Sequence, residues 1–274
     1  MFENSTEKVI YVYDGTFDGF LSCVYNFYYN RLKPEDIVRH DMAEPSFYRL
    51  YTIENDPQQI RRVKCALIDK MGRYNCEFLQ KVFLTNIPGK EMLMLNYIVA
   101  GFKEGKIIYN LVKYDCVYRL RKAYVALYRE REKFLGFVRF YKAGRVYVAK
   151  IHRDNNVLPL LANHFAQRFH KQSFVIFDEN NKQVLIYSQN RYKIVFVDNI
   201  DLPQPDEEEL KIRRLWKNFY DTIAIKEREN PKCRVSFMPK RYWQDLPETG
   251  AFAPAAENRA LPDEFRGFIY LLYH

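Results

Sequence analysis

Two carboxylates stand close together near the start of the chain, in the stretch YDGTFD (residues 13–18). Asp14 and Asp18 are four residues apart, where an apolar run ends and a helical pattern begins. Loops that follow strands carry ligand groups in α/β sheets, so this pair could bind a metal ion or share a proton. The alternative is a turn residue at Asp14 and an acid at Asp18 that complements the helix dipole. We favour this structural role and predict no metal site.

A second set of groups able to transfer protons lies between residues 152 and 170. His164 and Arg168 are four residues apart and share one face of a predicted helix. Asp154 together with His164 could serve acid–base chemistry. However, the spacing matches no metal-binding signature such as HExxH, and no Ser or Cys nucleophile stands near in sequence. We therefore favour structural roles, with Asp154 at the start of the helix.

The run KRYW (residues 240–243) combines two cations with two large aromatic rings and is bounded by prolines. Exposed rings can stack on nucleic-acid bases, whereas large rings in a compact domain are mostly buried. We expect Tyr242 and Trp243 mainly to anchor this corner of the fold. Lys240 and Arg241 would then be left to face an anion.

The positive charge of the chain is concentrated in two stretches. The net charge is +9, and residues 113–153 hold 12 Lys or Arg against 3 acids, while residues 211–245 hold 10 against 4. A polyanion-binding surface would produce such a split, although a solvated cationic face is the alternative. The predicted nucleic-acid-binding residues are Arg139, Lys142, Arg145, Lys150, Arg168, Arg213, Arg214, Lys217, Lys240, Arg241, Tyr242 and Trp243.

The composition excludes several classes of protein. The five cysteines are odd in number and form no CxxC pair, which argues for reduced thiols in the cytoplasm and against a disulfide framework or a thiolate zinc site. The N-terminus has acids and no apolar core, unlike a secretory signal. No apolar run approaches the length of a membrane span. We therefore expect a cytoplasmic protein without a membrane partner or a cofactor.

Hydrophobic periodicity predicts the elements that position these residues. A buried strand, a helix capped by Thr16, a second strand (47–55) and two helices (57–85 and 90–102) form a first lobe. Further along, the pattern predicts a helix at 115–134, a hairpin at 137–152, a helix at 156–170, strands at 173–179, 182–189 and 191–198, and a long helix from Asp206 to Asn230.

This order predicts an α+β fold. The strands after the first lobe should form an antiparallel sheet, in the order strand-strand-helix-strand-strand-strand, packed with the long helices. The stripe of Leu215, Phe219, Thr222 and Ile223 on the last helix should be buried. We place the domains at residues 1–112, 113–248 and 249–274, the last being a tail.

Five segments resemble one family: YDGTFDGFL, FLGFVRF, DNNVLPLLANHFAQRF, LWKNFYDTIAI and NPKCRVSFMPKRYW. It is a family of DNA metabolism or repair proteins encoded beside a radical-SAM protein, with a C-terminal domain similar to one fused to uracil-DNA-glycosylase-type proteins. The resemblance extends from about residue 9 to residue 248 and does not cover the tail. It implies a role in DNA repair and a radical-SAM partner, and it supplies no catalytic residue.

Three functions are compatible with these observations. The first is a DNA-binding accessory protein that works with a partner enzyme, and it is the one we expect. The second is an enzyme acting on damaged or modified DNA, glycosylase-like or nuclease-like, with Asp14, Asp18, Asp154 or His164 as its acids or bases. A role confined to binding the radical-SAM protein is a third possibility. The sequence alone leaves open whether the protein is an enzyme.

Overall fold

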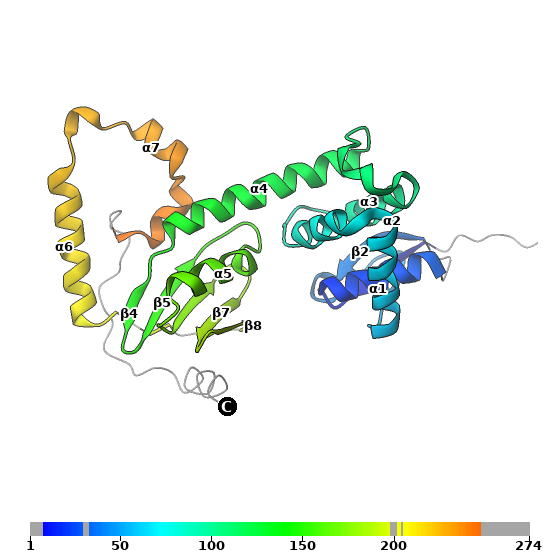
Figure 1. Ribbon diagram of the computed structural model, residues 1–274, viewed down its shortest axis with the longest axis horizontal. Coiled ribbons are helices and arrows are strands. Elements are labelled where there is room, and N and C mark those ends of the chain that lie inside the picture. The colour runs from blue at the N-terminus through cyan, green and yellow to red at the C-terminus, as the bar shows by residue number, and fades with distance from the viewer. Residues whose placement is uncertain (1–7, 30–32, 198–201, 204, 248–274) are drawn as a thin grey trace, which may run out of the picture. The chain divides into compact units, whose positions relative to one another are not determined.

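The computed structural model describes residues 8–29, 33–197, 202–203 and 205–247. The chain forms two compact units, with the boundary between Tyr128 and Arg129 (Figure 1). The first unit contains a three-stranded parallel sheet and the second a five-stranded mixed sheet, and helices accompany both. The predicted α+β class is therefore confirmed.

The first unit begins with the predicted strand, helix and further strands. They are β1 (Val9–Tyr13), α1 (Phe17–Tyr29), β2 (Pro34–Arg39) and β3 (Arg49–Thr52). The strand order is β2-β1-β3, and β1 pairs in parallel with both neighbours. Strand β2 was not predicted, because this edge strand is mostly polar and buries few of its side chains.

Two long helices complete the first unit, α2 (Pro57–Phe83) and α3 (Lys90–Glu104), with short 3₁₀ turns at His40–Met42 (η1) and Gly105–Asn110 (η2). Helix α2 is kinked at Gly72, whose φ of 79° no ordinary helix contains. Asp56 caps its first turn by accepting from the backbone N–H of Gln58 at 2.8 Å.

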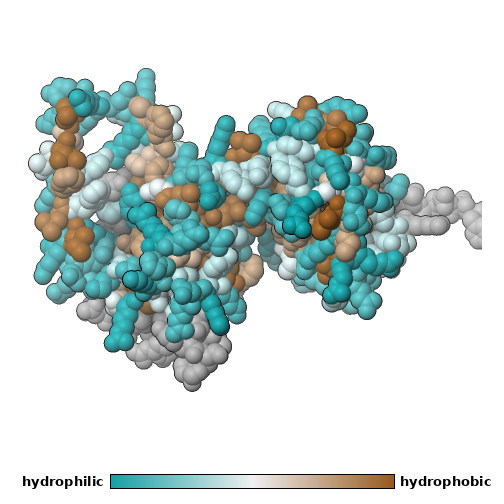
Figure 2. All heavy atoms as spheres, in the orientation of Figure 1, coloured by the Kyte–Doolittle hydropathy of each residue, from teal (hydrophilic) through white to brown (hydrophobic). Residues whose placement is uncertain are grey.

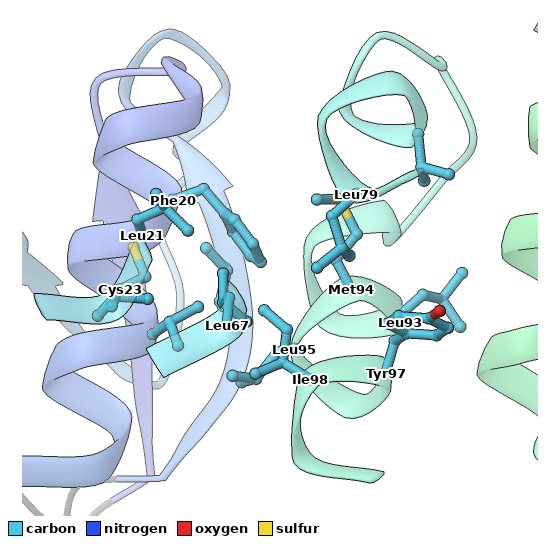
Figure 3. Close-up of a cluster of buried hydrophobic side chains, with 14 of the residues drawn as sticks. Phe20, Leu21, Cys23, Leu67, Leu79, Leu93, Met94, Leu95, Tyr97 and Ile98 are labelled. Atoms are coloured by element: carbon cyan, nitrogen blue, oxygen red, sulfur yellow. The ribbon is translucent and has the colours of Figure 1, made fainter. Parts of the chain in front are cut away.

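The core of the first unit lies where α1, α2 and α3 meet (Figure 3). Leu21 of α1, Leu67 of α2 and Met94 of α3 are fully buried there. These side chains come from helices whose apolar residues recur every three or four positions, which is why the sequence pattern locates the helices well.

Helix α4 (Asp115–Phe137) passes from the first unit into the second. Val117 and Leu120, near its start, belong to the core of the first unit, while the boundary falls after Tyr128. The predicted boundary at residue 112 places the whole helix in the second domain. In the structure the boundary lies within α4 instead, because the first turns of this helix supply apolar side chains to the core of the first unit.

The sheet of the second unit has the order β4-β5-β6-β7-β8. Its elements are β4 (Tyr141–Ala143), β5 (Val146–Ile151), α5 (Leu158–Arg168), β6 (Phe174–Asp178), β7 (Gln183–Ser188) and β8 (Arg191–Phe196). The predicted order of elements is confirmed, but the sheet is mixed rather than antiparallel, since β5 and β6 run parallel. Helix α5 returns the chain across the sheet between these neighbouring strands, and such a crossover makes them parallel.

Residues 206–246 form an arm that leaves the sheet and returns to α4 (Figure 1). It contains α6 (Glu207–Ile223), η3 (Lys226–Arg228), α7 (Pro231–Phe237) and η4 (Lys240–Asp245). Asp206 caps α6 as predicted, accepting from the backbone N–H of Glu209 at 2.8 Å. The predicted helix to Asn230 is too long, since α6 ends at Ile223.

The expected burial of the α6 stripe was wrong. Leu215 is 67% exposed, Phe219 54% and Ile223 57%, and no residue of α6 is buried. Contacts within the described residues fasten both ends of the arm to the rest of the unit. Tyr141 donates to the carbonyl of Pro203 just before α6, and Leu246 is buried at the far end.

Other expectations concern the whole chain. All five cysteines lie in the described part and are free thiols. Among the helices that the structure describes, none has both the length and the apolar character needed to cross a membrane. The predicted tail at residues 249–274 lies outside the described residues.

Candidate functional site

The carboxyl edge of the first sheet is where a parallel α/β arrangement places ligand groups. Strand β1 lies between β2 and β3 and runs parallel to both, so the carboxyl ends of all three strands lie at one edge of the sheet. Asp14 follows β1, and Asn55 follows β3. The two side chains meet, since Asn55 Nδ2 donates to Asp14 Oδ2 at 2.8 Å.

Asp14 is built into the turn that starts α1. Its carboxylate accepts from the backbone N–H and from the hydroxyl of Thr16, at 2.9 and 2.8 Å. Thr16 in turn accepts from the N–H of Gly19 at 2.9 Å, which confirms it as the helix cap. A Cβ at Gly19 would lie only 2.0 Å from Asp14 Oδ1, so glycine is required for this close approach.

Asp18 has a partner of its own, because Lys64 Nζ of α2 lies 2.7 Å from its Oδ1. Both carboxylates are thus used within the turn and the adjacent helix. Across the described residues, no group of three or more His, Cys, Asp or Glu is placed to hold a metal ion. The geometry matches the structural alternative for Asp14 and Asp18.

Buried polar contacts continue behind this edge. The hydroxyl of Tyr13, at the end of β1, donates to Glu91 Oε1 of α3 at 2.8 Å, and both side chains are buried. Burial, together with the negative charge of Glu91, raises the pKa of the Tyr13 hydroxyl, which keeps it protonated as a donor. This bond ties the sheet to α3.

In the second unit, a loop of residues 152–157 joins β5 to α5 and is held by Glu130 of α4. Glu130 is only 4% exposed. It accepts from the backbone N–H groups of Asp154 and Asn155 at 2.8 and 3.0 Å, and from the Asn155 side-chain amide at 2.6 Å. A carboxylate with three donors is a strong local constraint, so the loop has a fixed conformation.

Arg153 holds the same loop from the sheet side. It is 1% exposed and forms an ion pair with Asp178, at the end of β6, which is fully buried. It also donates to Gln183 Oε1 at 3.3 Å. Burial lowers the pKa of the Arg153 guanidinium, while the negative charge of Glu130 raises it.

The fixed loop presents Asp154 to Arg241 of the arm. The two form a hydrogen-bonded ion pair in which both side chains are about half exposed. His164, by contrast, has its Nε2 atom buried without a hydrogen-bond partner in the described part of the chain, and its ring contacts Phe165. The structure therefore joins Asp154 to Arg241 and not to His164.

The KRYW run behaves as an anchor for the end of the arm. Tyr242 is 3% exposed, and its ring packs on Phe134 and Phe137 of α4 at centroid distances of 5.2 and 5.5 Å. Trp243 is half-buried, donates from Nε1 to the carbonyl of Met238 at 2.8 Å, and lies under the guanidinium of Arg234. Burial leaves Tyr242 no free face for a base.

The predicted cations divide by their partners. One group lies beside carboxylates: Lys142 with Glu208 (3.7 Å), Lys150 with Glu179 (2.9 Å), Arg213 with Glu209 (3.0 Å), Lys217 with Asp221 (2.9 Å) and Arg241 with Asp154. Arg139 and Arg214 donate to the carbonyls of Gly136 and Leu210. Arg145, Arg168 and Lys240 are exposed, and among the described residues no carboxylate pairs with them.

Glu130, Arg153 and Asp178 were missed by the sequence analysis. A signal for Glu130 was present, because it occupies a position three residues after Leu127 and four before Phe134, on the apolar face of α4. An acid on such a face needs buried donors. Asp178 similarly ends the apolar run of β6.

Comparison with known proteins identifies a family for the second half of the chain. Residues 88–248 match the model of a domain of unknown function, DUF4130. No curated protein matches the chain. The matched region contains α3, α4, the mixed sheet, the fixed loop and the arm. Because it spans more than half of the chain, this protein belongs to the DUF4130 family.

Proposed function

We propose that this protein binds DNA through its second unit and serves DNA repair or DNA metabolism as the accessory of a partner enzyme. The support is the distribution of charge. Residues 129–247 hold 23 Lys or Arg against 15 Asp or Glu, a net charge of +8, whereas residues 1–128 hold 18 against 15, a net charge of +3. Anionic polymers bind where such an excess is gathered.

The observation that carries this proposal is how the acids of the second unit are used. Glu130 and Asp178 are buried and held by the loop and by Arg153. Asp206 caps α6. Acids used internally cannot pair with the exposed cations, so those cations stay available to an anion that approaches from the solvent.

Arg145, Arg168 and Lys240 are the predicted cations best placed for phosphate, because they are exposed and no described carboxylate pairs with them. A cation already paired with a carboxylate must break that pair before it can bind phosphate. The three therefore contribute more to binding than Lys217 or Arg241. Contacts of this kind recognise the backbone and not the base sequence.

The test is a fluorescence-anisotropy titration of labelled single-stranded and duplex DNA at several salt concentrations. We expect binding that weakens linearly on a log–log plot of affinity against salt. Replacing Arg145, Arg168 and Lys240 together by Ala should reduce the slope of that plot by up to about 2–3, since each lost phosphate contact removes about 0.7–0.9.

A charge-matched control distinguishes a site from a general loss of charge. Lys33, Arg61 and Lys103 are exposed cations of the first unit, and replacing them by Ala removes the same charge. The control should keep nearly the affinity and slope of the original protein. Absence of DNA binding at low salt, or an equal loss in both triple variants, would refute the proposal.

The identity of the partner rests on the family resemblance alone, which implies a radical-SAM protein. The proposal therefore takes the radical-SAM protein as the enzyme that the DNA-bound chain assists. Co-purification of the two proteins after nuclease treatment would support a direct contact. Association that disappears with the nucleic acid would mean that DNA alone brings them together.

A further inference from the structure

Helix α6 carries an exposed apolar stripe along its length (Figure 2). Ile212, Leu215, Trp216, Phe219 and Ile223 follow the three- and four-residue spacing of one helix face, and they are between 43% and 67% exposed. A helix with such a face normally buries it against a core. A continuous exposed stripe of this kind marks a surface that docks another apolar segment.

The composition of the stripe indicates what kind of partner it fits. Three of its five side chains, Ile212, Leu215 and Ile223, are aliphatic and offer no aromatic face, so a base could stack only on Trp216 or Phe219 and most of the stripe would stay uncovered. The partner should therefore be an apolar peptide segment rather than a nucleic acid. Lys211 lies beside the stripe by helical spacing, so acids in the partner would complement it.

The end of this same chain has that chemistry. Residues 263–273 begin with Asp263 and Glu264 and then repeat apolar side chains at Phe265, Phe268, Ile269 and Leu272. These four positions have the same three- and four-residue spacing as the stripe. The segment lies outside the described residues.

We propose that residues 263–273 dock on the apolar stripe of α6 within the same chain. The connection is long enough, because the 15 residues 248–262 span up to about 50 Å when extended, whereas the 17 residues of α6 are about 26 Å long. Tethering by such a linker gives an effective concentration in the millimolar range, so even weak intrinsic affinity closes the contact.

A second copy of the chain is a poorer occupant. A second copy must be recruited from solution, whereas the tail is tethered to the same chain, which favours the tail at low protein concentration. Asp263 and Glu264 of the tail also bring negative charge to Lys211 beside the stripe.

The experiment uses Trp216 as the reporter. The chain has two tryptophans, so the full chain with Trp243→Phe has Trp216 as its single source of tryptophan emission. In this background, Phe268, Ile269 and Leu272 are replaced together by Ser. We expect the emission of Trp216 to shift to longer wavelength and acrylamide quenching to increase several-fold, because the docked segment is lost.

The matched control replaces Tyr270, Leu271 and Tyr273 by Ser, which removes apolar side chains outside the repeated spacing. It should leave emission and quenching nearly unchanged. A synthetic peptide of residues 263–273, added to the first triple variant, should restore the shorter wavelength. Light scattering should find a monomer throughout.

Three results would overturn the proposal. If acrylamide quenches Trp216 equally in the background chain and in both triple variants, the tail does not cover it. Trp216 that is protected in every variant, with the mass of a dimer, would assign the stripe to a second copy. Equal effects of the two triple variants would mean that general hydrophobicity, and not the spacing, is responsible. None of these measurements involves DNA.

Discussion

Glu130 is a charged residue whose role is to fix the backbone of a neighbouring loop. It lies buried on α4 and accepts three hydrogen bonds from Asp154 and Asn155. Because its oxygens are occupied inside the protein, Glu130 is not available to pair with an exposed cation of the second unit. The ion pair of Arg153 with Asp178 is buried in the same way. Glu130, Arg153 and Asp178 thus fix the loop that carries the exposed carboxylate of Asp154.

Replacing Glu130 by Gln tests this role. The amide keeps the shape but turns one acceptor into a donor that faces backbone N–H groups, so at least one buried N–H loses its partner. We expect the free energy of unfolding to fall by about 1–3 kcal/mol, measured by urea denaturation. Glu132→Gln is the control, since Glu132 is an exposed ion-pair partner of Arg131, and it should cost at most about 1 kcal/mol. Equal costs would contradict the role.

Glu179 gives a prediction about pH. Burial raises the pKa of its carboxyl, but hydrogen bonds from Lys150 and His152 more than offset this, so the folded pKa lies below the ordinary value. Such a group stabilises the fold above the pKa of the unfolded chain, about 4.3 for glutamate, and the contribution is lost as pH falls through the folded pKa.

We therefore expect Glu179→Gln to lower the free energy of unfolding by up to about 1 kcal/mol at neutral pH, because the pair is partly exposed to solvent that screens it. The difference should vanish in acid, where the carboxyl of the original protein is protonated. Urea denaturation over a range of pH measures it, with the exposed Glu44→Gln as a control that should change nothing. A difference that grew as the pH fell would refute the assignment.

Some residue roles were accessible from the sequence and others were not. Thr16 and Asp206 were identified as helix caps, because a cap is determined by the residues next to it, and both caps form. The link of Asp154 to Arg241 joins residues 87 positions apart. Nothing in local spacing indicates such a contact, since it depends on how the arm returns to the sheet.

At the scale of elements, the pattern of apolar residues predicted most helices and strands but not how the strands pair. The parallel pairing of β5 with β6 follows from the path of α5, which periodicity does not report. The amphipathic pattern of α6 was equally clear, and burial was expected from it. In the described structure this face is exposed. Periodicity identifies an apolar face without specifying what covers it, so burial could not be inferred from the pattern alone.

Gly72 gives a prediction at this scale. It interrupts α2 with φ 79° and ψ 159°, a region that residues with a side chain rarely adopt. Replacing it by Ala should cost about 1–3 kcal/mol of unfolding free energy, even though a Cβ would contact only the flexible side chain of Lys106 at 3.4 Å. Thermal and urea denaturation measure this cost.

Gly136 in α4 is the matched control. A Cβ there would meet nothing within 4 Å, and Ala is more favourable than Gly in a helix by about 0.5–1 kcal/mol. Gly136→Ala should therefore stabilise the protein. If Gly72→Ala were also stabilising, the kink would not be a constraint of the native backbone.

At the scale of the whole molecule, the two units have separate cores. The described core cluster of the first unit extends from Val9 to Leu120, and that over one face of the second sheet includes Ala143, Val148 and Ile186. Units with separate cores open separately unless a large interface couples them. Helix α4 has buried side chains in both units, with Leu120 in the core of the first unit and Phe134 packed on Tyr242 in the second.

We predict that core truncations affect one unit at a time. Leu67 and Ile176 are fully buried in the first and second unit, and replacing either by Ala should cost about 2–5 kcal/mol locally. Hydrogen exchange measured by mass spectrometry should accelerate across α2 and α3 in Leu67→Ala and across β5 to β8 in Ile176→Ala. Within α4, hydrogen exchange around Leu120 should accelerate in Leu67→Ala, and exchange around Phe134 should accelerate in Ile176→Ala. Acceleration of both units in both variants would show that α4 couples them into one cooperative structure.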